Sequence, residues 1–127
     1  MDKKISVYAI PAVRRSSREV NIFNVPDNSR SLTIHQVIFH TCHVFNVTPE
    51  KIKPKNRKKE FTLARHAIRW FCIRFLKLKP IEVRYQFHIS YGAIYASLKT
   101  VVDLCETDKI YREKFLEVKS RLTKQIK

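Results

Sequence analysis

The stretch that decides the fold is residues 80–100, which read PIEVRYQFHISYGAIYASLKT. Lys79-Pro80 is typical of a helix start, because proline is tolerated in the first helical turn. His88-Ile89 supplies a tight turn, and Ser90 is placed to cap a second helix. Apolar residues recur at helical spacing on both sides of the turn. The stretch therefore predicts two helices joined by a short turn, a helix-turn-helix.

A strongly cationic stretch, residues 51–79, lies immediately upstream of this motif. It contains one acid, Glu60, against eleven lysines and arginines. These cations are Lys51, Lys53, Lys55, Arg57, Lys58, Lys59, Arg65, Arg69, Arg74, Lys77 and Lys79. A charge run is most often a solvated surface, but a basic loop that leads into a helix-turn-helix is typical of proteins that bind DNA phosphates.

The composition agrees with a single globular domain that binds a polyanion. Hydrophobic residues make up 44% of the 127 residues, which is enough for a packed core. Lys and Arg total 26 against 11 acids, and a net charge of +15 opposes compaction unless a polyanion binds. No run approaches 18 apolar residues, and no apolar signal region follows Lys4. We therefore expect a soluble cytoplasmic protein with no membrane partner.

Helical periodicity over residues 31–127 predicts an all-α helix-turn-helix bundle. Thr33 and Gln36 have the spacing of a capping box, which opens a helix over residues 33–46. Thr62 and Thr107 are interpreted as the caps of two later helices. The residues expected to face the core of the later helices are Leu63, Ala67, Ile68, Phe71, Cys72, Phe75, Leu76, Ile94, Leu98, Val101, Cys105, Tyr111, Phe115, Val118 and Leu122.

Residues 1–30 differ from the rest and predict an extended N-terminal arm. Two β-prone segments, residues 5–10 and 20–25, are each ended by a proline and suggest a hairpin. A lone hairpin is marginal in water, so the arm must pack on the domain, on a second copy or on DNA. Trp70 is expected to pack against it. The arm is thus a candidate surface for self-association or for a protein partner.

Several chemistries are disfavoured by the residues present. The single glycine, Gly92, rules out a glycine-rich phosphate loop. The three cysteines are far apart and are interpreted as free buried thiols. His40 and His43 are one turn apart, but no further ligands have matching spacing, so we expect no metal and no cofactor. No acid–base pair is placed for catalysis, and we expect a protein that is not an enzyme.

The candidate DNA contacts come from the basic loop, the helix that follows it and the second helix of the motif. Arginine is favoured in narrow minor grooves, which makes Arg57 the candidate for insertion there. The small side chains of the second helix would allow a close approach to the duplex. The full set is Lys53, Lys55, Arg57, Lys58, Lys59, Arg65, Arg69, Ser90, Tyr91, Gly92, Tyr95 and Lys99.

Four sequence features occur together in this order. They are VTPEKI at residues 47–52, the basic loop, ARHA at residues 64–67, and Glu82-Val83 followed by Phe87. From Thr33 to Leu122 their order and spacing resemble the C-terminal DNA-binding domain of the bacterial replication initiator DnaA, which has a Trp-repressor-like helical fold. The resemblance implies duplex-DNA binding linked to replication origins. It also implies that Arg57 enters a minor groove and that Arg65 contacts a phosphate.

The chain departs from this family in the helix that reads bases. The family shows an Arg-Asp-His-Ser/Thr-Thr-Val run, whereas residues 89–94 here read ISYGAI. Nothing in residues 1–30 resembles the family's ATPase module, so we expect a free-standing module whose DNA specificity is weak or altered. Two alternatives remain open. One is a protein-interaction module that uses the same fold without base readout, and the other is an RNA-binding protein.

Overall fold

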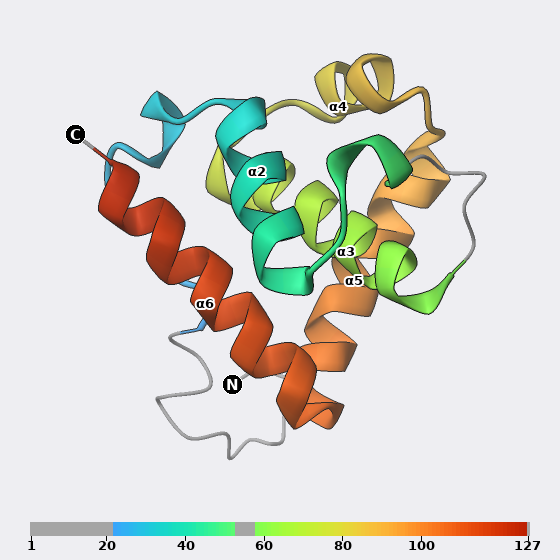
Figure 1. Cartoon of the computed structure of the whole chain (residues 1–127). Helices are drawn as coiled ribbons and strands as arrows, with labels where there is room; N and C mark the ends of the chain where they lie inside the picture. The colour runs from blue at the N-terminus through green and yellow to red at the C-terminus, as the bar shows by residue number, and fades with distance from the viewer. Residues whose placement is uncertain (1–21, 53–57, 127) are drawn as a thin grey trace, which may run out of the picture.

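The computed structural model describes residues 22–52 and 58–126, and these residues form a helical bundle (Figure 1). The elements are η1 (Ser29–Ser31), α2 (Ile34–Phe45), η2 (Pro49–Lys51), α3 (Lys59–Trp70), η3 (Phe71–Phe75), α4 (Pro80–Phe87), α5 (Tyr91–Thr107) and α6 (Lys109–Gln125). Within the described residues no strand occurs. The predicted all-α fold class is therefore confirmed.

The start of α2 confirms the predicted capping box. The Gln36 backbone N–H donates to the Thr33 hydroxyl at 3.2 Å, and the Thr33 N–H donates to the Gln36 side chain at 2.8 Å. The helix ends where Asn46 adopts a left-handed conformation, with φ of 59°. Its N–H there bonds to the carbonyls of Cys42 and His43, which would otherwise lack partners.

Two of the predicted helix caps are wrong. Helix α3 begins before Thr62, at Lys59, and the Thr62 hydroxyl donates to the Lys58 carbonyl within the first turn. Lysine and glutamate favour helix, so the charged residues ahead of Thr62 extend it. At α6 the cap is Asp108, whose carboxylate accepts from the Tyr111 N–H at 3.1 Å. Aspartate is the stronger N-cap, and Thr107 instead ends α5.

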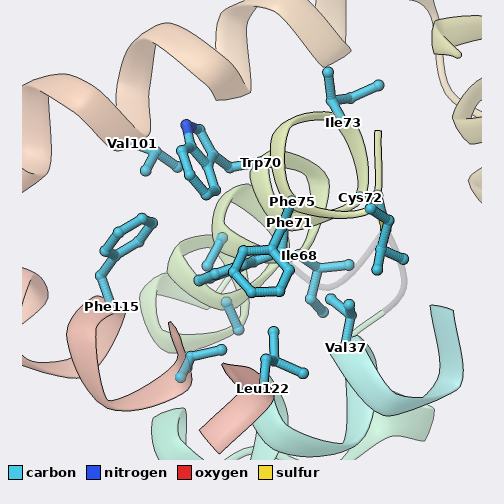
Figure 2. Packing of buried hydrophobic residues seen from close by; sticks show 14 of the residues in the cluster. Val37, Ile68, Trp70, Phe71, Cys72, Ile73, Phe75, Val101, Phe115 and Leu122 are labelled. Atoms are coloured by element: carbon cyan, nitrogen blue, oxygen red, sulfur yellow. The ribbon is translucent and has the colours of Figure 1, made fainter. Parts of the chain in front are cut away.

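The core is built around α3 and the turn of π-helix, η3, that continues it. Helix α3 packs against α2 and α5, and α6 packs against the same two helices. Side chains from α2, α5 and α6 converge on the α3–η3 segment (Figure 2). The Phe71 ring stacks on Phe115 with centroids 5.0 Å apart, and Trp70 meets Phe115 edge-on at 4.9 Å. These buried ring contacts hold α6 against the α3–η3 segment.

The C-terminal part of the predicted arm lies against this core. The Phe23 ring is 5.8 Å from Trp70 and 5.7 Å from Phe115, measured between centroids. The Lys119 ammonium donates to the Ile22 carbonyl at 3.1 Å. The expected contact between Trp70 and the arm is therefore confirmed at Phe23. Residues 22–30 form turns and η1, whereas the proposed hairpin falls almost entirely on residues outside the described part.

The three cysteines are free and buried, as predicted. Burial raises the pKa of the Cys72 thiol to about 12, and burial and the nearby Glu50 raise the pKa of Cys42 to about 11. These thiols are therefore protonated at neutral pH and belong to the core. Across the described residues, no helix combines the length and the apolar character that crossing a membrane requires.

Candidate nucleic-acid interface

The pair of helices α4 and α5 is built by local bonds at the predicted positions. At the start of α4 the Lys79 N–H donates to the Glu82 carboxylate at 2.8 Å. Helix α4 ends at His88, which takes a left-handed conformation with φ of 55°. The Ser90 hydroxyl then accepts from the Ala93 N–H at 3.1 Å and caps α5. The predicted turn and the predicted Ser90 cap are therefore confirmed.

Helix α5 buries one face and exposes the other. Its buried face includes Ile94, Leu98, Val101 and Cys105, as the periodicity predicted. Its exposed face at the N-terminal end carries the predicted site residues Tyr91, Gly92, Tyr95 and Lys99, together with Ala96. Tyr91 is 41% exposed and Tyr95 is 55% exposed, so both rings are accessible to solvent. This face is therefore available to a partner.

Gly92 has no packing reason to be glycine. It does not have a positive φ, and a Cβ built there would meet only the Ser90 hydroxyl, at 3.8 Å. Gly92 is the second residue of α5, where glycine costs at most the roughly 1 kcal/mol that it costs in a helix interior relative to alanine. The space beside Gly92 is therefore open in the described structure.

An arginine of α4 contacts the first aromatic residue of α5. The Arg84 guanidinium lies over the Tyr91 ring, 5.1 Å from its centroid. Such a contact is favourable because the ring face is electronegative. Arg84 was not among the predicted site residues, because its partner lies in the next helix. The contact restricts the Tyr91 ring while leaving much of it exposed.

A buried polar joint links α3 to α5. Ser97 is fully buried, and its hydroxyl accepts a 2.9 Å hydrogen bond from the Arg69 guanidinium. The Ser97 oxygen is also 2.9 Å from Nδ1 of His66. Burial, followed by the charges of Arg69 and Arg65, lowers the pKa of His66 below its usual 6.5. The lowered pKa favours the neutral ring of His66. In that form Nδ1 can accept a hydrogen bond from the Ser97 hydroxyl, while Arg69 donates a hydrogen bond to the Ser97 oxygen.

Arg65 connects the residues on either side of the basic loop. Its guanidinium donates to the Ile52 carbonyl at 3.2 Å and to the Thr62 hydroxyl at 3.1 Å. Thr62 in turn donates to the Lys58 carbonyl at 3.2 Å. Ile52 precedes residues 53–57 and Lys58 follows them, so Arg65 links both flanks of the loop to the first turns of α3. Arg65 and Arg69 were predicted as DNA contacts, and both are engaged with the fold itself.

The remaining predicted site residues divide into two groups. Lys58 and Lys59 are exposed where α3 begins, and α3 packs directly against α5. Lys53, Lys55 and Arg57 lie outside the described residues, so their predicted roles stay predictions. In the part of the chain that is described, no group of three His, Cys, Asp or Glu side chains could hold a metal ion.

No protein-family model matches the chain, and neither does any curated protein.

Proposed function

We propose that this chain binds double-stranded DNA, with α5 in the major groove and the basic loop on the phosphate backbone. The observation that carries the proposal is the exposed face of α5, capped at Ser90, beside a stretch with eleven cations and one acid. A capped helix that follows a short turn is the element that such motifs place in the groove. The net charge of +15 favours a polyanionic partner.

The proposed contacts have different roles. Lys53, Lys55, Lys58 and Lys59 neutralise phosphates, and Arg57 enters the minor groove. Tyr91, Tyr95 and Lys99 face the major groove, where Gly92 allows a close approach. Arg65 has its main effect through the loop flanks, because its guanidinium is bonded to Ile52 and Thr62. Arg69 acts through Ser97 in the same indirect way.

The resemblance to the DnaA C-terminal domain supports a proposal for the biological role. We propose a relative of that domain that binds or regulates a replication origin, with sequence preferences of its own because residues 89–94 lack the family's base-reading run. The protein would act without a cofactor, and in the cytoplasm, where bacterial DNA is held. The lost base-reading run also supports the alternative of a protein-interaction module.

RNA binding is a second candidate, because Tyr85 is 72% exposed and lies near Tyr91 and Tyr95 in the sequence. Exposed aromatic rings are the usual stacking surfaces for unpaired bases. The test is a fluorescence anisotropy titration at 50 mM salt with a random 20-base-pair DNA duplex, the matching single strand and an RNA hairpin. Tightest binding to the duplex supports the proposal. Tighter binding to RNA supports the second candidate, and no binding to any of the three supports a protein-interaction role.

A further inference from the structure

Three of the four exposed large aromatic residues in the described part of the chain lie on α4 and α5, and the fourth, Phe39, lies on α2. Among the described residues, seven large hydrophobic side chains are exposed, and four of them, Ile81, Tyr85, Tyr91 and Tyr95, belong to these two helices. Tyr91 and Tyr95 are four residues apart on α5 and therefore lie on the same side of that helix. The face that would enter the major groove is thus aromatic.

The first two turns of the same face lack the side chains that read purines. From Tyr91 to Lys99, α5 carries no Arg, Asn, Gln, Asp or Glu. Bidentate recognition of guanine or adenine requires Arg, Lys, Asn or Gln, and Lys99 is the one such residue, two turns into the helix. The Ser90 hydroxyl already accepts from Ala93. In these two turns, the groups of α5 that can contact base edges are therefore apolar surface and the phenol groups of Tyr91 and Tyr95.

The environment of Tyr91 favours contact with a groove over stacking between bases. The Arg84 guanidinium lies over one face of the Tyr91 ring. That ring face is therefore not free to stack on an unpaired base. Gly92 and Ala96 add no bulk beside the two tyrosines. The backbone of α5 can therefore come close enough for Tyr91 and Tyr95 to reach the edges of the base pairs.

The apolar feature that base pairs present in the major groove is the 5-methyl group of thymine. 5-Methylcytosine carries the same group in the same position on its ring. Building on the duplex-DNA binding proposed above, we infer that α5 recognises a 5-methylpyrimidine in the major groove through Tyr91 and Tyr95. Arg84 is a positioning residue in this arrangement, because it acts through Tyr91.

The test compares duplexes that differ only in methyl groups. One pair is an A·T-rich 20-base-pair duplex with thymine or with deoxyuridine, and the other is a G·C-rich duplex with cytosine or with 5-methylcytosine. Affinities are measured by anisotropy at fixed salt. We expect deoxyuridine to weaken binding about fourfold per contacted methyl group, the effect of one buried methyl-sized group. If the methyl group is sufficient, 5-methylcytosine strengthens binding by a similar factor.

Variants assign the effect to the two tyrosines. Tyr91→Ala and Tyr95→Ala should each shrink the difference between thymine and deoxyuridine, while Tyr91→Phe should keep it because the ring is retained. Lys99→Ala serves as the control and should weaken binding to both duplexes equally. All three side chains are exposed, and thermal melts check that each variant is folded.

The outcomes separate this inference from the function on which it rests. Equal affinities for the thymine and deoxyuridine duplexes overturn methyl recognition and leave duplex binding standing. A methyl effect that is unchanged in Tyr91→Ala and Tyr95→Ala overturns the assignment to these residues. No binding to any duplex, or tighter binding to single strands, overturns the proposed function itself. A response to thymine without one to 5-methylcytosine restricts the inference to thymine.

Discussion

Arg69 on α3 donates a 2.9 Å hydrogen bond to the buried hydroxyl of Ser97 on α5. The bond joins a partly buried cation of the basic stretch to the inner face of the helix proposed to enter the groove. A hydrogen bond to a charged group contributes roughly 1.5–3 kcal/mol, more than one between neutral groups. The position of α5 relative to α3 therefore depends on a polar contact as well as on the apolar core.

Replacing Ser97 with alanine should destabilise the protein and weaken DNA binding. The change leaves Arg69 and His66 without their shared partner, and unmet hydrogen bonds of partly buried groups cost about 1–3 kcal/mol. The free energy of unfolding is measured by urea denaturation. Ser120→Ala is the control, because Ser120 is exposed on α6 and its loss should change stability by no more than about 0.5 kcal/mol. Equal free energies of unfolding for Ser97→Ala and Ser120→Ala would show that the hydrogen bonds of Ser97 do not stabilise the protein.

Stability should fall as the pH drops below about 6.5, in part because of His66. Its folded pKa is lowered by burial, by Arg69 and by Arg65, so the folded state favours the neutral ring. The unfolded state binds the proton first as the pH falls, and stability is lost from the unfolded pKa down through the folded one. Above pH 6.5 the contribution is complete.

The variant His66→Asn isolates this effect, because an amide oxygen can accept from Ser97 without titrating. Urea denaturation from pH 5 to pH 8 should show a shallower acid-side loss in the variant. His40 also has a lowered pKa, through burial, Arg121 and His43, and its contribution persists in both proteins. An identical pH dependence in wild type and variant would contradict the prediction.

Duplex binding should depend steeply on salt. Six neutralised phosphates give a slope of log K against log salt of about −5, from roughly −0.9 per contact. The reason is the excess of cations in residues 51–79, where eleven face a single acid. Titrations at four salt concentrations between 50 and 300 mM test it, as anisotropy reports each affinity directly. A slope near zero would mean that the basic stretch does not contact the phosphates.

Arg65→Lys should weaken duplex binding although it keeps the positive charge. Lysine is not a planar fork, so it cannot reproduce the two bonds to Ile52 and Thr62. We expect the free energy of unfolding to fall by about 1 kcal/mol. We also expect the residues that flank the basic loop to be less firmly fixed to α3. Arg74→Lys is the matched control, because Arg74 is exposed and the exchange there is conservative. Equal duplex affinities and equal stabilities of Arg65→Lys and Arg74→Lys would show that Arg65 contributes only its charge.

The elements that sequence reasoning placed correctly are those with local signals. The capping box of Thr33 and Gln36, the Ser90 cap and the buried face of α5 all follow from residues within a few positions of one another. The wrong caps were also local, since Thr107 stands next to the stronger cap Asp108. Such errors move a boundary and leave the packing unchanged.

The contacts that sequence reasoning missed are between distant residues. Ser97 bonds to partners 28 and 31 positions away, and its neighbours in the chain do not indicate which residues those partners are. Arg69 was assigned to DNA on its charge, and Arg65 on its charge and on the resemblance to the DnaA domain. Charge does not reveal whether a guanidinium faces a partner or a carbonyl of its own chain, and tertiary packing decides that here. A serine on a buried helical face is the one clue that could have indicated a polar joint.

Gly92→Ala should move stability and DNA affinity in opposite directions. A Cβ at this position meets only the Ser90 hydroxyl at 3.8 Å, so alanine fits and should stabilise α5 by up to about 1 kcal/mol. The same methyl group would lie between the α5 backbone and the duplex and should weaken binding. Urea denaturation and anisotropy titration of one preparation measure both effects. Ser120→Ala, at an exposed position of α6, should leave binding unchanged. A Gly92→Ala protein that is more stable and binds duplex as tightly as wild type would show that no partner approaches this turn closely.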